Sequence, residues 1–166
     1  MRAMRCTCFA GLPASLLALV GGLSAVSAVQ MPDQRGGHDS LAAHRGSPVV
    51  VVVVDARRLG TVRRWEQDLL TRFPGLRVLT VADVNEARPT SAERVAQVLA
   101  RRVPAEVAVL IDMERLWARE LELDTAAPNL VLIAADGSLV ATFRGRWNAQ
   151  LADEVATRVA ALGAMT

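Results

Sequence analysis

The sequence predicts an α/β domain with a central, mostly parallel sheet, helices on both faces of that sheet, and an antiparallel hairpin near the C-terminus. Three observations lead to this fold class. A run of six valines at 49–54 is typical of a strand that is buried on both faces. Segments with helical periodicity alternate with further short apolar runs, as in proteins built around parallel sheets. Asp136-Gly137 lies between two apolar runs and is a strong signal for a tight hairpin turn.

The N-terminal residues 1–28 have the parts of a secretory signal peptide. Arg2 and Arg5 form a basic start, an apolar stretch follows at 12–23, and small residues lead up to Ala28. We expect cleavage after Ala28 and therefore a periplasmic or secreted mature protein. The apolar stretch is shorter than the roughly 20 residues that a spanning helix needs, and no later stretch is longer. We therefore expect no membrane span in the mature chain.

Both cysteines of the chain, Cys6 and Cys8, lie in this leader. Neither follows the small and apolar run that a lipid-attachment cysteine needs, so we expect both to leave with the leader. Loss of the two leader arginines leaves 17 basic residues against 17 acidic ones. A domain with this balance lacks the basic footprint of a nucleic-acid-binding protein, so nucleic acid is not an expected partner. The sequence contains no lysine or tyrosine, which excludes a Schiff-base lysine and a tyrosine acid.

Residues 29–47 are polar and show no sustained apolar period, which indicates a flexible lead-in to a single domain at 48–166. This lead-in contains both histidines of the chain and two nearby aspartates. A metal site needs ligands held in fixed geometry, and a flexible segment offers no such scaffold. We therefore interpret these four residues as solvated linker residues: His38, His44, Asp33 and Asp39.

The sequence pattern in the first half of the domain predicts two strand–helix units. After the strand at 49–54, residues 61–73 place an apolar stripe on one helical face, and the next strand is predicted at 76–82. Thr90, with Glu93 three residues later, forms a capping-box signature for a second helix. The inner faces of the two helices are predicted to be Val62, Trp65, Leu69 and Phe73, and Val95, Val98, Leu99 and Val103.

The second half predicts a third strand at 107–111, a short helix at 114–121, and hairpin strands at 130–134 and 139–143. Asn148 is suited to cap a last helix that ends at Gly163. The inner face of this helix is predicted to be Leu151, Val155, Val159 and Leu162.

The three tryptophans receive different predictions. Trp65 and Trp117 fall on apolar helical faces and are expected in the core. Trp147 follows the hairpin beside the last helix cap, where two uses are open. The first expected use is packing beneath the hairpin, and the second is a partly exposed anchor for a partner protein.

The order of these elements, with Ala127-Pro128-Asn129 directly before the hairpin, resembles the thioredoxin-like fold, and in particular its branch of periplasmic peroxiredoxins and thiol reductases. The stretch from Val109 through Trp117 to Gly137 looks like the corresponding region of that branch, including an extra strand before the proline loop. Within the branch, the chain is most similar to the small exported YtfJ-like group. The resemblance covers residues 48–162 and implies a cis peptide bond at Pro128.

The chain departs from this branch at the position of its cysteines. In active members a Cys-x-x-Cys pair, or a single peroxidatic cysteine, follows the first core strand at the start of the next helix. Here the resemblance places Leu59 and Val62 where the two sulfurs would be. Disulfide exchange needs an attacking thiolate, so we expect neither thiol–disulfide oxidoreductase nor cysteine peroxidase activity, and no cofactor.

In proteins of this fold, the groove between the helix start and the proline loop receives an extended peptide or partner, and such binding needs no sulfur. The resemblance therefore implies a binding site at Asp55, Arg57, Arg58, Ala127 and Pro128. The other interpretation of the proline is that it only sets the turn before the next strand. The leading hypothesis is an exported, non-redox binding protein that serves as an adaptor or accessory factor for an envelope protein or peptide.

A metal-dependent enzyme is the alternative. Asp55, Asp83 and Asp112 stand at or just past strand ends, the edge where ligands bind to open α/β sheets. On parallel neighbouring strands these carboxylates would converge into a magnesium or phosphoryl-transfer site, as in a metal-dependent hydrolase. Against this, no lysine or Gly-rich loop is present to bind phosphate, and Arg57 and Arg58 could simply pair with the acids. A serine triad is excluded because the predicted domain has no histidine.

Overall fold

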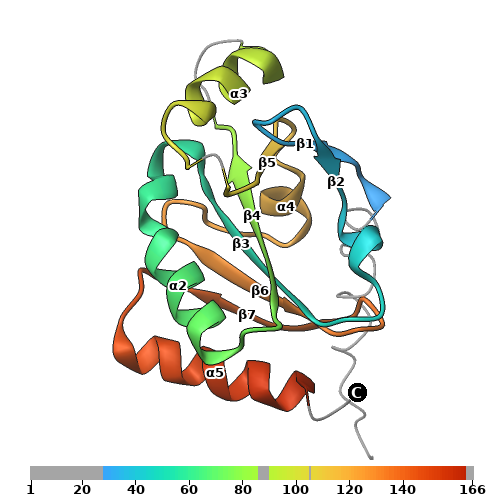
Figure 1. The fold of residues 1–166 in the computed structure, drawn as a ribbon, viewed down its shortest axis with the longest axis vertical. Coiled ribbons are helices and arrows are strands. Elements are labelled where there is room, and N and C mark those ends of the chain that lie inside the picture. Colours follow the sequence, from blue (N-terminus) through green and yellow to red (C-terminus); the bar gives the residue numbers. More distant parts are fainter. Residues whose placement is uncertain (1–27, 86–89, 105, 164–166) are drawn as a thin grey trace, which may run out of the picture.

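The computed structural model describes residues 28–85, 90–104 and 106–163 (Figure 1). A five-stranded sheet in the order β5-β4-β3-β6-β7 lies at its centre. β3, β4 and β5 are parallel, whereas β6 runs antiparallel to both of its neighbours, β3 and β7. The predicted fold class, with its antiparallel C-terminal hairpin, is confirmed. The strands are β3 (Val49–Asp55), β4 (Arg77–Asp83), β5 (Val109–Asp112), β6 (Asn129–Ile133) and β7 (Leu139–Arg144).

The valine run forms the central strand β3, and each of its residues is buried. Successive side chains of a strand point to opposite faces, so the six valines divide evenly between two apolar layers. The even-numbered valines pack with Trp65 and Leu69, and the odd-numbered ones with Trp117 and Leu41. Stiff β-branched side chains suit a strand covered on both faces. Trp65 and Trp117 are therefore core residues, as predicted.

Helices cover both faces of the sheet (Figure 1). α2 (Arg63–Arg72) and α5 (Ala149–Gly163) pack over the even-numbered valines of β3. α3 (Ala92–Ala100) covers the same face nearer to β5, and α4 (Leu116–Glu120) covers the opposite face. Of the described helices, none has the length and apolar character needed to cross a membrane.

Two details of α3 differ from the prediction. Its N-cap is Ser91 rather than Thr90, and the Ser91 hydroxyl accepts a hydrogen bond from the Arg94 amide at 3.3 Å. Val98 was placed on the inner face but is 41% exposed, whereas Leu99 is buried. The reason is that α3 lies over the end of the sheet (Figure 1), so only a narrow stripe of the helix meets β4 and β5.

The C-terminal hairpin and helix form as predicted. Gly137 adopts a φ of 88°, a conformation that suits glycine, and its amide donates to the Ala134 carbonyl at 2.9 Å. The Asn148 side chain accepts a hydrogen bond from the Leu151 amide at 3.0 Å and so caps α5. Trp147 packs partly buried against the apolar layer under the hairpin. Its ring centre lies 3.8 Å from the guanidinium carbon of Arg64.

Much of the segment 29–47, for which the sequence predicted a flexible lead-in, packs against the sheet. Apolar Met31 and Leu41 enter the same layer as the odd-numbered valines of β3. The Gln34 side chain also covers the free edge of β5, since its amide donates to the Val107 carbonyl at 2.6 Å and its oxygen accepts from the Val109 amide at 2.8 Å. Edge strands need such partners for their unpaired main-chain groups. The elements of this segment are β1 (Met31–Pro32), β2 (His38–Asp39) and the 3-10 helix η1 (Leu41–His44).

Of the two histidines of this segment, His38 is exposed, whereas His44 differs from a solvated linker residue. His44 is largely covered, and its Nε2 atom lies 2.9 Å from an Asp39 carboxylate oxygen. The pair is local and joins η1 to β2. Of the predicted signal peptide at 1–28, residues 1–27, with Cys6 and Cys8, lie outside the described part.

Candidate functional site

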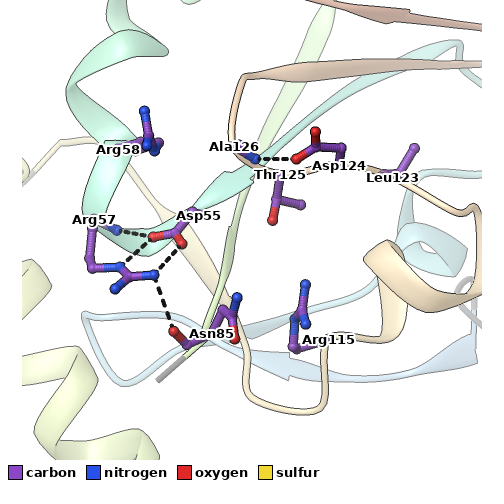
Figure 2. A pocket seen from close by; sticks show the side chains of 9 residues that line it. All are labelled: Asp55, Arg57, Arg58, Asn85, Arg115, Leu123, Asp124, Thr125 and Ala126. Atoms are coloured by element: carbon purple, nitrogen blue, oxygen red, sulfur yellow. Dashed lines mark hydrogen bonds and ion pairs between the residues drawn. The ribbon is translucent and has the colours of Figure 1, made fainter. Parts of the chain in front are cut away.

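A cleft of about 790 Å³ opens at the carboxyl ends of β3 and β4. One wall is formed by Asp55 and by the start of the 3-10 helix η2 (Ala56–Thr61), which joins β3 to α2. The facing wall is the loop 123–126 before β6 (Figure 2). Two further residues, Asn85 after β4 and Arg115 before α4, complete the lining. Of the predicted binding residues, Asp55, Arg57 and Arg58 lie in this cleft.

Asp55 is held by the residue two positions later. One of its carboxylate oxygens accepts hydrogen bonds from the Arg57 amide at 2.8 Å and from Arg57 Nε at 3.0 Å, and the other accepts from an Arg57 Nη atom at 2.8 Å. The hydrogen bonds from the Arg57 side chain keep the pKa of Asp55 below its ordinary value. Asp55 is therefore an ionised carboxylate that anchors the start of η2.

Asp83 is fully buried at the base of the cleft and is compensated by two side chains. Arg115 Nε lies 3.1 Å from one Asp83 oxygen, and an Arg115 Nη atom lies 3.3 Å from the other. The Thr125 hydroxyl donates to the same carboxylate. A carboxylate removed from water needs such partners, because an unpaired buried charge is strongly unfavourable. Asp83 thereby ties α4 and the loop before β6 to the end of β4.

The backbone of Arg115 is unusual. Its φ of 57° and ψ of 35° lie in the left-handed region, which a residue with a side chain rarely adopts. A left-handed backbone conformation costs free energy, and the two hydrogen bonds from the Arg115 guanidinium to Asp83 help to hold the residue in it.

The three strand-end acids lie in register, Asp55 beside Asp83 and Asp83 beside Asp112, so they share one face of the sheet. They do not form the predicted metal site. Asp55 is engaged by Arg57, Asp83 by Arg115, and Asp112 by the Trp117 amide at 2.9 Å. Among the described residues, no group of three or more His, Cys, Asp or Glu side chains is placed to hold a metal ion. The acids instead serve as anchors for local structure.

Ala127 and Pro128 lie beside the cleft but do not line it. Pro128 is buried, and its carbonyl accepts a hydrogen bond from the Gly145 amide at 2.9 Å. The peptide bond before Pro128 is trans, since no cis bond occurs in the described part of the chain, so the cis form implied by the resemblance is wrong. The lining residues are those just before this pair, Asp124 to Ala126.

Much of the main chain of this loop is already hydrogen-bonded. The Asn129 side chain donates to the carbonyls of Asp124 at 2.9 Å and Ala127 at 3.0 Å. The Thr125 carbonyl accepts from the Asp55 amide at 3.0 Å. Asp124 accepts from the Ala126 amide and pairs with Arg144. The cleft therefore presents mainly side chains, and above all arginines, to a ligand.

Leu59 and Val62, which stand at the positions that the resemblance implies for the two sulfurs, are packing residues in the structure. Val62 is buried, and Leu59 is partly buried in the apolar layer under α2. These positions now contribute packing between η2, α2 and the sheet.

Sequence reasoning missed several residues of the cleft. Arg115, Thr125 and Asn85 come from three separate loops, and no motif joins them. The one available signal was Asp83 itself, because an acid at the end of a buried strand requires a cation or hydrogen-bond donors nearby. Which arginine supplies that charge depends on the fold.

No family model and no curated protein matches this chain. Several solved structures are similar in fold. The exposed lipoprotein thioredoxin Etrx1 of Streptococcus pneumoniae is 16% identical with a TM-score of 0.62, and the similarity covers 78% of this chain and 97% of Etrx1. DsbF of MTB is 18% identical with a TM-score of 0.61, covering 83% and 97% of the two chains.

A peroxiredoxin gives a similar result. Peroxiredoxin Q of Xanthomonas campestris is 17% identical with a TM-score of 0.59, and the similarity covers 83% of this chain and 94% of that protein. At such low identity the likeness concerns the arrangement of the chain and not its chemistry. Together with the observed order of strands and helices, it establishes that this chain has a thioredoxin-like fold.

Proposed function

We propose that this chain is an exported, non-redox protein of thioredoxin-like fold that binds an envelope protein or peptide in the cleft at Asp55, Arg57 and Arg58. One observation carries the proposal. The cleft lies between the start of η2 and the loop before β6, and residues 29–166 contain no cysteine. A partner can occupy this cleft, but the residues around it supply no thiolate for disulfide exchange.

The side chains of the cleft favour binding over catalysis. Asp55 is ionised and held by Arg57, and Asp83 is covered by Arg115 and Thr125. Both carboxylates are thus already occupied by partners within the chain, so neither is presented to a substrate as an unpaired side chain. The described residues that line the cleft include no histidine. What remains is a polar surface with several guanidinium groups, which are suited to recognising a partner.

The proposed location follows from the N-terminal sequence. The basic start, the apolar stretch and the small residues before Ala28 support export and cleavage after Ala28. Among the proteins of similar fold, Etrx1 is described as an exposed lipoprotein. Within this fold, we propose the small exported YtfJ-like group as the nearest relation.

Site-specific photo-crosslinking in intact cells tests the proposed function. A photoreactive amino acid, p-benzoylphenylalanine, replaces Asn85 in the cleft or, as a control, the exposed Arg158 on α5. We expect a defined envelope adduct from position 85 that is absent from position 158. We also expect the double variant Arg57→Gln and Arg58→Gln to weaken this adduct at least severalfold.

The matched control is Arg101→Gln with Arg158→Gln, which removes the same charge from exposed positions outside the cleft. Circular dichroism checks that both double variants are folded. If the adduct from position 85 is equally strong in the cleft variant and in the control variant, the cleft is not the binding site.

A further inference from the structure

We infer that the cleft recognises a carboxylate of its peptide partner, either an acidic side chain or the C-terminus, through the guanidinium of Arg115. The inference rests on the proposed function, which states only that a partner binds there. It names the chemical group that the partner presents.

Arg115 has donors left for a ligand. Its side chain is 41% exposed and lines the cleft, although Nε and one Nη atom contact Asp83. The other Nη nitrogen makes no hydrogen bond with a described residue. An arginine carries its N–H donors in a rigid fork that matches the two oxygens of a carboxylate. The outer edge of this fork is therefore available on the cleft side.

The guanidinium is also held in place before any ligand arrives. Its partner Asp83 is fully buried, so Arg115 cannot swing into solvent without leaving that carboxylate without a countercharge. Thr125, which lines the cleft, donates to the same carboxylate and restrains it from the other wall. Binding to a side chain that is already fixed costs less conformational entropy than binding to a side chain that becomes ordered only with the ligand.

The charge around the cleft favours an anion. Three acids at or beside the cleft each pair with an arginine, Asp55 with Arg57, Asp83 with Arg115, and Asp124 with Arg144. The neighbouring Asp112 accepts instead from the Trp117 amide. Arg58 forms no ion pair with a described residue and is exposed on the wall formed by η2. The described residues that line the cleft thus include three arginines and two aspartates, one positive charge in excess. A neutral ligand leaves this charge uncompensated, whereas a carboxylate compensates it.

The size and lining of the cleft favour a peptide over a small anion. A volume of about 790 Å³ is in the range of sites that enclose sizeable ligands, much larger than a phosphate ion. In Figure 2 the Asn85 side chain lies between Arg57 and Arg115, where its amide can hydrogen-bond a peptide group. Leu123 and Ala126 add apolar surface on the facing wall.

Isothermal titration of the purified protein with matched octapeptides tests the inference. The first peptide carries glutamates and has both ends capped, and the second replaces each glutamate by glutamine. The third is the glutamine peptide with a free C-terminal carboxylate, and inorganic phosphate is the fourth probe. We expect the first or third peptide to bind at least about 10-fold more tightly than the second, which corresponds to one charge-assisted pair.

Two variants locate the effect. The neutral pair Asp83→Asn with Arg115→Gln removes the cation without leaving a buried charge, and we expect it to abolish the preference for the acidic peptide. Arg119→Gln removes an exposed arginine of α4 outside the cleft, and we expect it to keep the preference. Should the neutral pair fail to fold, the salt dependence of the unmodified protein decides, because recognition of a carboxylate must weaken as ionic strength rises.

The outcomes separate the inference from the proposed function. Equal affinity of the unmodified protein for the glutamate peptide and the capped glutamine peptide overturns carboxylate recognition, while the crosslink from position 85 still supports a partner. Binding of phosphate as tight as that of the acidic peptide shows a small-anion site and overturns the inference as well. Loss of the peptide preference in Arg119→Gln shows that total charge, rather than Arg115, is responsible.

Discussion

Asp83 shows how one residue organises the cleft. It is the last residue of β4, and the strand buries its carboxylate completely. Because a buried charge is tolerated only with partners, the N-cap of α4 supplies Arg115 and the loop before β6 supplies Thr125. Three segments that are distant in the sequence are thereby joined at one side chain. The same contacts orient the guanidinium that we infer to bind a ligand.

Replacement of Arg115 by alanine tests this dependence. The change leaves the Asp83 carboxylate with only the Thr125 hydroxyl, so we expect the free energy of unfolding to fall by about 2–4 kcal/mol. Urea denaturation at neutral pH measures the loss. The neutral pair Asp83→Asn with Arg115→Gln is expected to lose less, since no charge is left unpaired. An unchanged denaturation midpoint in Arg115→Ala would mean that Asp83 has other compensation.

Asp55 predicts a pH dependence of stability. The Arg57 side chain holds the pKa of folded Asp55 below the ordinary value of 3.8, so ionised Asp55 stabilises the folded state above that value. This contribution is lost as the pH falls from about 4 through the lower, folded pKa. We expect Asp55→Asn to lose less stability over that acid range than the unmodified protein does. Urea titrations from pH 6 down to about pH 2 measure the difference, and parallel curves would contradict it.

At the scale of elements, local sequence signals predicted most strands and helices. The valine run, the Asp136-Gly137 turn and the Asn148 cap each lie within a few residues of the structure they specify. The predicted start of α3 was wrong by one residue, because two neighbouring residues were equally suitable as its N-cap. Thr90 and Ser91 both have a hydroxyl that can cap α3, and in the structure Ser91 has the extended backbone of the N-cap position, with a φ of −99° and a ψ of 157°.

The assignment of this cap can be checked with a pair of variants. We expect Ser91→Ala to lower the free energy of unfolding by about 1 kcal/mol, because the Arg94 amide loses its acceptor. Thr90→Ala serves as the matched control and is expected to have a much smaller effect. Thermal unfolding of the two variants compares them directly. A larger loss in Thr90→Ala would restore the capping box predicted from the sequence.

At the scale of the whole molecule, the segment 29–47 belongs to the structure of the domain. Met31 and Leu41 complete the apolar layer under α4, and Gln34 covers the edge of β5. The sequence pattern did not reveal this role, because the buried residues are few and are separated by polar ones. Their burial depends on the surface that the rest of the domain offers.

Removal of residues 29–47 tests the boundary predicted at residue 48. We expect a chain that begins at 48 to be less stable by several kcal/mol than one that begins at 29, since two apolar side chains and the cover of β5 are lost. Thermal unfolding and the hydrogen exchange of the Val109 amide measure the change. Equal melting temperatures for the two chains would show that this segment adds nothing to stability.

The sequence by itself determined the fold class, the order of the sheet strands and α-helices from β3 to α5, and the confinement of cysteine to positions 6 and 8. These properties depend on periodicity, turn chemistry and composition, which are local or global features of the chain. The tertiary structure alone decided that Arg115 pairs with Asp83, that Pro128 is buried and does not line the cleft, and that each strand-end acid already has a partner. Such contacts join residues from separate loops, so they exist only once the sheet has brought those loops to one edge.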